Sequence, residues 1–303
     1  MTDWAVIGVP TSAGAHHAGQ ELAPTALRAA GLLDRLRAAG LTVVDTGDLP
    51  GSRFAVDHKH PLARNADAVV AVAQQVATSV DEQLAAGRRP LVIGGDCTIT
   101  IGAVAGFRRR GHDVGLAYVD GDADLGMLHP DRSGILDDTG ITHLLGHGYE
   151  GLVGLNGDGP LLAPSRLAIV GCDPREVTAE DRRFLADAGV SYREAADLAA
   201  DPDAVAVEAL AALKESASGV ADDARPVLVH FDVDVVDSGD LPLGNFPHYG
   251  SGVQLKDAVA TLRVLLADPD CSGLVLTEVN PTYDPAGSQL DRYVDGLVQA
   301  LSG

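Results

Sequence analysis

The sequence predicts an α/β fold built on a doubly wound, mostly parallel sheet. Short apolar runs alternate with Ala- and Leu-rich segments of helical length along the whole chain, which is the pattern typical of that fold. Three of the apolar runs end in acidic clusters, and open α/β sheets place their ligand sites at the carboxyl ends of their strands. No repeat, low-complexity tract or linker divides the chain, so we expect one domain covering residues 1–303.

Continuous apolar runs of this length indicate strands that are buried on both faces. The predicted strands are residues 4–9, 41–44, 91–94, 115–120, 167–170, 227–232 and 273–278. The predicted helices are residues 23–39, 65–86, 98–110, 179–188, 204–216, 256–267 and 289–302. Two long irregular stretches each follow an acidic cluster, and loops of this length in a compact domain are usually functional; they are residues 126–140 and 237–252.

The composition indicates a soluble enzyme with a large core. The chain has 303 residues, 46% of them hydrophobic, and no apolar stretch approaches the ~20 residues that a membrane span needs. The first residues lack a basic segment followed by a long apolar one, so we expect no secretory signal. Three scattered cysteines, Cys97, Cys172 and Cys271, favour a reducing cytoplasm over a disulfide framework. The net charge of -21 disfavours nucleic acid and anionic membranes as partners.

The acidic clusters predict a metal site. They read Gly94-Gly95-Asp96-Cys97, Val119-Asp120-Gly121-Asp122-Ala123-Asp124 and His230-Phe231-Asp232-Val233-Asp234. Residues two apart in a strand point to the same face, so the acids within each cluster can converge where the strand ends. Carboxylates and a thiol gathered at one sheet edge repel each other unless a multivalent cation is present.

These residues resemble the ureohydrolases, the family of arginase, agmatinase and formimidoylglutamase. Four elements match the family's Gly-Gly-Asp-His, Asp-Ala-His-x-Asp, third metal and Glu-Val-Asn-Pro elements in order and approximate spacing: Gly94 to Cys97, Asp120 to Asp124, Phe231 to Asp234, and Glu278 to Pro281. The family's opening segment is similar to Gly8-Val9-Pro10, Gly14, Gly19 and Pro24 to Arg28. The resemblance implies a three-layer α/β/α sandwich, a small-molecule substrate, and a homo-oligomer that is a trimer or hexamer. It also implies two Mn²⁺ ions bridged by a hydroxide, and hydrolysis of a guanidinium or amidine carbon.

The resemblance also assigns roles position by position. It implies that one metal is held by Cys97, Asp120, Asp124 and Asp232, and the other by Asp120, Asp122, Asp232 and Asp234. Paired divalent ions about 3.5 to 4 Å apart lower the pKa of a shared water and create a nucleophile near neutral pH. Asp124 would orient that nucleophile, and Glu278 would accept the substrate's guanidinium through paired hydrogen bonds.

Two of the family's ligand histidines are replaced here, by Cys97 and Asp122. The family's four carboxylates and two imidazoles carry four negative charges, which two divalent ions balance. Five carboxylates and a thiolate carry six. Thiolate favours softer ions, whereas carboxylates favour Mg²⁺, Ca²⁺ or Mn²⁺, so the ligand set is mixed and does not fix the metal or whether one or two ions bind.

The loop after the second cluster departs from arginase as well. Arginases carry Ser-Gly-Asn-Leu-His-Gly there, with the histidine as a proton shuttle, and this chain has Asp137 in its place, followed by Asp138. A carboxylic acid whose pKa is raised by its neighbours can act as a general acid. The asparagine that holds the α-carboxylate of arginine is replaced by Gly126, while the matching Ser133 is present. These departures argue against L-arginine as the substrate.

Simpler interpretations of the same residues stay open. Asp96 is expected to cap the helix that follows it, Cys97 read alone is a buried inert thiol, and Asp122 is a solvated loop acid. Asp137 and Asp138 equally fit an ordinary acidic turn.

The histidines show no metal spacing. We expect His143 to be a packing residue with satisfied hydrogen bonds. A regular strand is expected to turn His230 away from the neighbours of Asp232. The second function class is a non-catalytic protein of the same fold that binds a ligand or a partner subunit, because three histidines of the family's site are missing. The replaced positions all keep potential donors, which favours the enzyme.

Overall fold

The computed structural model describes residues 3–157, 159–214 and 225–303, and every strand assigned in them belongs to one sheet. The strands lie in the order β2-β1-β3-β8-β7-β4-β5-β6, and each neighbouring pair is parallel. Their bounds are Trp4–Gly8 (β1), Val43–Asp48 (β2), Arg89–Ile93 (β3), Gly115–Val119 (β4), Leu167–Cys172 (β5), Ser191–Glu194 (β6), Val227–Asp232 (β7) and Cys271–Thr277 (β8). The prediction of a doubly wound parallel sheet is confirmed.

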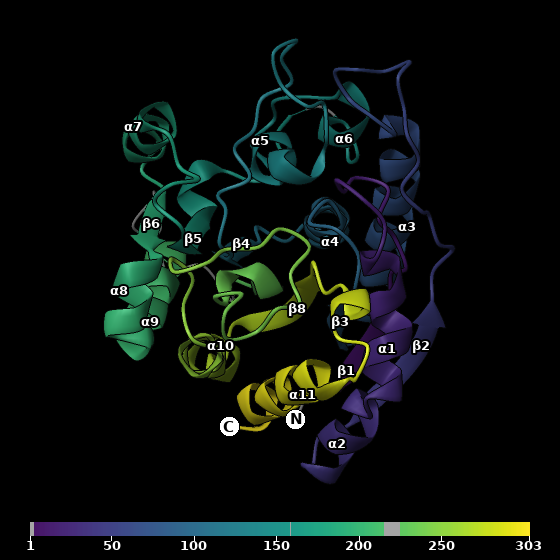
Figure 1. The fold of residues 1–303 in the computed structure, drawn as a ribbon, viewed down its shortest axis with the longest axis vertical. Helices are drawn as coiled ribbons and strands as arrows, with labels where there is room; N and C mark the ends of the chain where they lie inside the picture. Colours follow the sequence, from purple (N-terminus) through teal and green to yellow (C-terminus); the bar gives the residue numbers. More distant parts are fainter. Residues whose placement is uncertain (1–2, 158, 215–224) are drawn as a thin grey trace.

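Helices cover both faces of the sheet (Figure 1). One core is formed by the sheet with Ala23–Ala29 (α1), Leu32–Ala38 (α2), Ala195–Ala200 (α8), Pro202–Lys214 (α9), Leu255–Ala267 (α10) and Ser288–Ser302 (α11). The core on the other face takes Ala66–Ala85 (α3), Ile99–Arg109 (α4), Gly140–Leu144 (α5), Glu150–Val153 (α6) and Ala179–Ala188 (α7). The arrangement is the three-layer α/β/α sandwich that we predicted. No helix of the described residues is long and apolar enough to cross a membrane.

Several elements differ from the prediction for local reasons. The predicted helix 23–39 is two helices, because Gly31 adopts a left-handed conformation (φ 80°) between α1 and α2. The edge strand β6 was missed, since its Ser-Tyr-Arg-Glu sequence is only half-buried and contains no apolar run. The short helices α5, α6 and α8 were not predicted either. The end of the predicted helix 204–216 lies outside the described residues beyond Lys214.

The four central strands position the site. In the order β3-β8-β7-β4 they are neighbours in the sheet, although they come from distant parts of the sequence. Because all four are parallel, their carboxyl ends meet at one edge, where Ile93, Thr277, Asp232 and Val119 are the last strand residues. The loops that carry the acidic clusters begin directly after them.

Close packing of α3 against α4 depends on a glycine at position 102. A Cβ built there would lie 2.5 Å from the carbonyl oxygen of Ala73 and 2.8 Å from Cβ of Val76. We expect Gly102→Ala to lower the free energy of unfolding by about 1–3 kcal/mol, because α3 and α4 must move apart. Urea unfolding measures this, with Ala71→Ser on the exposed face of α3 as a control that changes it by less than about 1 kcal/mol. A neutral Gly102→Ala would contradict the contact.

Candidate metal centre and active site

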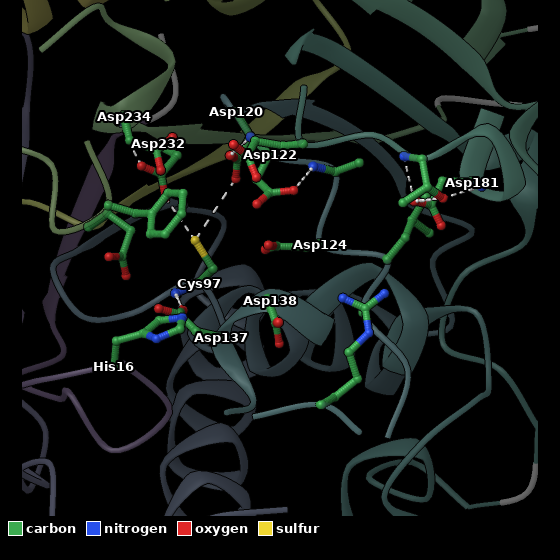
Figure 2. A pocket seen from close by; sticks show the side chains of 18 residues that line it. His16, Cys97, Asp120, Asp122, Asp124, Asp137, Asp138, Asp181, Asp232 and Asp234 are labelled. Atoms are coloured by element: carbon green, nitrogen blue, oxygen red, sulfur yellow. Dashed lines mark hydrogen bonds between the residues drawn. The ribbon is translucent and has the colours of Figure 1, made fainter. Parts of the chain in front are cut away.

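A cavity of about 220 Å³ opens at the carboxyl edge of the central strands. Most of its charged lining is acidic, and Arg132 and His16 are the basic residues among the described residues that line it. Figure 2 shows the sulfur of Cys97 facing Asp120 and Asp232, with Asp124 approaching the same space from the side. The remaining predicted acids that line the cavity are Asp122, Asp137, Asp234 and Glu278.

The innermost group of the site consists of Cys97, Asp120, His230 and Asp232, all buried, with one potential ligand atom of each within 4.8 Å of the others. The thiol of Cys97 donates to Asp232 Oδ2 at 2.8 Å and lies 4.0 Å from Asp120 Oδ2. His230 Nε2 lies 3.3 Å from Asp120 Oδ2 and 4.0 Å from the Cys97 sulfur. The structure therefore brings together a sulfur, a nitrogen and two carboxylates.

The expectation that His230 points away from Asp232's neighbours is wrong. Both residues lie within β7, and residues two apart in a regular strand share a face, so the regular strand itself directs the imidazole toward Asp120. The spacing His-x-Asp at the end of a predicted strand was the signal available in the sequence. Burial lowers the pKa of His230 to about 3, so the ring is neutral and can act as a ligand.

The second half of the site contains Asp122 and Asp234. Asp234 Oδ1 accepts from the backbone N–H of Gly121 at 3.1 Å, and Asp122 Oδ1 accepts from that of Ala123 at 2.7 Å. Burial and the charge of Asp234 raise the pKa of Asp122 to about 7. Asp122 is therefore more than the solvated loop acid of the simpler interpretation.

His248 belongs to the same half of the site and was not predicted. It comes from the irregular segment 237–252, is 2% exposed, and places Nε2 3.7 Å from Asp234 Oδ2. Burial lowers its pKa, but attraction to Asp234 and Asp173 outweighs that effect and raises the pKa to about 9. A side chain on Gly121 would collide with this ring, because a Cβ there would lie 2.8 Å from Nε2. The signals available in the sequence were the Gly at position 121, where the family has Ala, and the long irregular segment 237–252.

Asp124 is held differently from the other predicted ligands. Its Oδ2 accepts the phenolic hydrogen of Tyr118, and its backbone is left-handed with φ 46°. It lines the cavity but is outside the group of donor atoms that surrounds Cys97. Its roles as ligand and as the residue that orients the nucleophile remain predictions.

Asp137 and Glu278 form a second group with Cys97. Asp137 Oδ1 accepts from the backbone N–H of Cys97 at 2.8 Å, and Glu278 Oε2 accepts from Gln20 Nε2 at 2.9 Å. Among the residues that the structure describes, Glu278 Oε1 has no hydrogen-bond partner although it is buried. Burial, and then neighbouring carboxylates, raise the pKa of both acids well above the usual range. Asp137 is buried, so it does not belong to an ordinary exposed acidic turn.

The loop that should hold an amino acid substrate is arranged otherwise. Ser133 is exposed, is not among the described residues that line the cavity, and its hydroxyl accepts from the N–H of Ile135 at 3.1 Å. At Gly126 even a Cβ would lie 2.5 Å from the carbonyl oxygen of Asp138, so the loop has no room for the family's asparagine. Substrate binding by Ser133 stays a prediction.

One of the simpler assignments agrees with the geometry and one does not. Asp96 does not cap α4, whose N-cap residue is Thr98 with no side-chain cap hydrogen bond; instead Asp96 is buried and accepts from the N–H groups of Gly14 and Thr98, which ties an N-terminal loop to the start of α4. His143 accepts from the N–H of Tyr149 at Nε2 (3.0 Å) and donates from Nδ1 to the carbonyl of Thr139 (2.8 Å), as a packing histidine does.

The electrostatics of the site fit a bound cation. Burial, and then mutual repulsion, raise the pKa of Asp120, Asp124 and Asp232 well above the range of an ordinary aspartate. Burial does the same for the Cys97 thiol. Oxygen, nitrogen and sulfur donors gathered in this way are the ligand chemistry of divalent metals, and binding one would remove the repulsion.

Comparison with known proteins agrees with this geometry. The model of the Arginase family matches residues 2–301. Arginase from Bacillus subtilis (strain 168) is 28% identical over 298 residues, covering 98% of this chain and 97% of the relative. Arginase-1 from Homo sapiens is 28% identical over 298 residues, covering 97% and 89%.

Solved structures give the same result. A crystal structure of Bacillus subtilis arginase superimposes with a TM-score of 0.85 at 27% identity and covers 100% of this chain and 99% of its own. Proclavaminate amidino hydrolase from Streptomyces clavuligerus has the same fold, with a TM-score of 0.72 at 20% identity and coverage of 100% and 91%. The chain therefore belongs to the arginase family, a family of hydrolases that act on carbon–nitrogen bonds.

Proposed function

We propose that the protein is a metal-dependent hydrolase that cleaves a carbon–nitrogen bond of a guanidino or amidino compound other than L-arginine. The observation that carries this proposal is Glu278. Its Oε1 is buried without a partner among the described residues, and Glu278 lines the cavity beside Cys97 and Asp137. Leaving a carboxylate oxygen unpaired costs free energy, so such an oxygen indicates a cationic ligand.

A guanidinium or amidinium group satisfies this requirement. It is planar, positively charged and able to donate paired hydrogen bonds to a carboxylate. The largely acidic lining favours a cationic ligand, and a volume of about 220 Å³ is suited to a small molecule. Gln20 holds the other oxygen of Glu278, which fixes the direction of Oε1.

The carboxylates and Cys97 would hold one or two divalent ions, and we propose Mn²⁺ for the oxygen-rich half around Asp122 and Asp234. Such ions, when bound, lower the pKa of a coordinated water and supply a nucleophile near neutral pH. We assign the orienting of the attacking water to Asp124, whose Oδ2 accepts from the hydroxyl of Tyr118.

Asp137 is the proposed proton carrier for the leaving amine. A general acid must hold a proton at working pH, and burial beside Asp96 raises the pKa of Asp137 in the required direction. The N–H of Cys97 holds Oδ1, so Oδ2 is left to exchange the proton. Asp137 thus takes the place that the histidine shuttle has in arginases.

L-Arginine is disfavoured because the loop near Gly126 has no side chain for its α-carboxylate and no room for one. Arg132 comes from that loop and is one of the residues that line the cavity. A non-catalytic protein of this fold finds no support, since each replaced ligand position keeps a donor directed into the site.

Glu278→Gln tests the proposed function. With Mn²⁺ supplied, the parent should hydrolyse one member of a panel of guanidino acids, amidines and N-substituted guanidines, and turn over L-arginine well below the ~10 per second usual for enzymes. Glu278→Gln should lower kcat/KM for the active compound by about 10²-fold or more, because the guanidinium loses its charged partner. Metal content should stay unchanged.

Gln20→Ala is the matched control, since it removes the partner of Oε2 and keeps the carboxylate. It should reduce kcat/KM less than Glu278→Gln. If folded, metal-loaded protein hydrolyses no compound of the panel, the binding-protein function replaces the enzyme.

A further inference from the structure

We propose that His230 is a metal ligand, and that with Cys97, Asp120 and Asp232 it forms a four-donor site that prefers a zinc-like ion to manganese. The inference rests on the metal centre of the proposed function and specifies one half of it. None of the family's ligand positions assigned above includes residue 230. His230, on β7, would therefore supply the imidazole ligand that the family has at the position of Cys97.

The four donor atoms all lie within 4.8 Å of one another, so small shifts of the side chains would bring them round a single small cation. Ligands bonded to a tetrahedral zinc at ~2.0–2.3 Å lie about 3.3–3.6 Å from one another. The Nε2 of His230 is 3.3 Å from Asp120 Oδ2, and the Cys97 sulfur is 4.0 Å from both of these atoms. The Cys97 sulfur and Asp232 Oδ2 are closer, at 2.8 Å, because the thiol donates a hydrogen bond there that a metal would replace.

The imidazole is fixed in the orientation that ligation requires. Its ring stacks on Tyr118 with centroids 3.9 Å apart, and Nδ1 lies 2.7 Å from the hydroxyl of Thr100 in α4. When Nδ1–H donates to that hydroxyl, the lone pair of Nε2 faces Asp120 and Cys97, with the hydroxyl of Thr277 also 3.4 Å away. Ligand histidines characteristically anchor the distal ring nitrogen in this way.

The donor types determine the expected metal. Thiolate and imidazole suit Zn²⁺, whereas Mn²⁺ prefers carboxylate and water oxygens. Asp124, which the family pattern would add to this half, directs its Oδ2 to Tyr118 and adds no oxygen to the group. The deeper half of the site is thus sulfur- and nitrogen-rich, while Asp122 and Asp234 form an oxygen-rich half beside it.

Metal preference measured without any substrate tests the inference. Competitive titration of the metal-free protein should show that His230→Asn lowers the ratio of Zn²⁺ to Mn²⁺ affinity by about tenfold or more. Zinc generally binds proteins more tightly than manganese, so the ratio in the variant is compared with the ratio in the unmodified protein. His143→Asn is the matched control, because it changes an equally buried histidine whose partners are Thr139 and Tyr149, and it should leave the ratio unchanged.

Zinc-edge X-ray absorption of the unmodified protein gives a result that does not depend on whether His230→Asn folds. We expect one sulfur neighbour at about 2.3 Å together with imidazole scattering. An oxygen-only shell, a sulfur without imidazole, or equal ratios in His230→Asn and the parent would overturn the assignment. Folded protein that binds Mn²⁺ without preferring Zn²⁺ would overturn this inference alone, whereas protein that binds neither ion would overturn the proposed function with it.

Discussion

Metal-free protein should become less stable as the pH rises from about 4 to about 7, and a divalent cation should reverse that trend. In the unfolded chain the carboxyl groups of the site ionise near pH 4. Burial raises their folded-state pKa, to about 7 for Asp122 and well above the usual range for Asp120 and Asp232. Above pH 4 the unfolded state therefore releases protons that the folded state retains, and the free energy of unfolding falls.

Calorimetry at pH 5 and pH 8 checks this prediction. With a chelator present, Tm should be lower at pH 8 by a few degrees, since a loss of about 2 kcal/mol corresponds to ~3 °C in a chain of 303 residues. Saturating Mn²⁺ or Zn²⁺ should raise Tm more at pH 8 than at pH 5, because a metal binds the ionised ligands.

Asp122→Asn should flatten part of the decline, while Asp67→Asn, which changes an exposed acid at the start of α3, should leave the profile intact. Metal-free protein whose Tm rises between these two pH values would show that the acids are already neutralised by other means.

Asp232→Ala should remove far more bound metal than Asp122→Ala. Asp232 is fully buried and lies at the centre of the site, where its Oδ1 accepts from the N–H of Asp234 and its Oδ2 from Cys97 and Thr277. Asp122 is partly exposed and its Oδ1 holds only the N–H of Ala123. We expect affinity losses of about 10²-fold or more for Asp232→Ala and about tenfold for Asp122→Ala.

Elemental analysis after dialysis against known metal concentrations measures both losses. Asp232→Asn keeps the shape of the side chain and separates loss of charge from loss of packing. Equal losses in the Asp232 and Asp122 variants would contradict the assignment of Asp232 as the shared ligand and Asp122 as a terminal one.

The sequence predicted the strands that consist mostly of apolar residues. β3, β4 and β7 were found because buried strands of a parallel sheet are almost wholly apolar. β6 was not, because an edge strand with a polar sequence resembles a loop. The order of the strands was not predicted either, since neither length nor composition shows which strands are neighbours.

The candidate site divides in the same way. The three acidic clusters were predicted to converge, because each follows a strand whose end lies at the same edge. His230 was missed although it lies two residues before Asp232. We expected its side chain to point away from the neighbours of Asp232, whereas it points toward Asp120. His248 gave almost no signal, because only the tertiary structure places an irregular segment over Gly121.

The order of the central strands also bears on how the protein is made. Cys97 and Asp120 follow β3 and β4, and Asp232 is the last residue of β7, while β8, which lies between β3 and β7 in the sheet, comes near the end of the chain. The donors cannot assemble until that last strand has been synthesised and paired, so nascent chains have no complete ion site. Contacts between such distant segments close slowly. Metal binding should therefore be a late step in folding. In a refolding experiment, the thiolate–metal absorption signal should appear after helical structure has recovered.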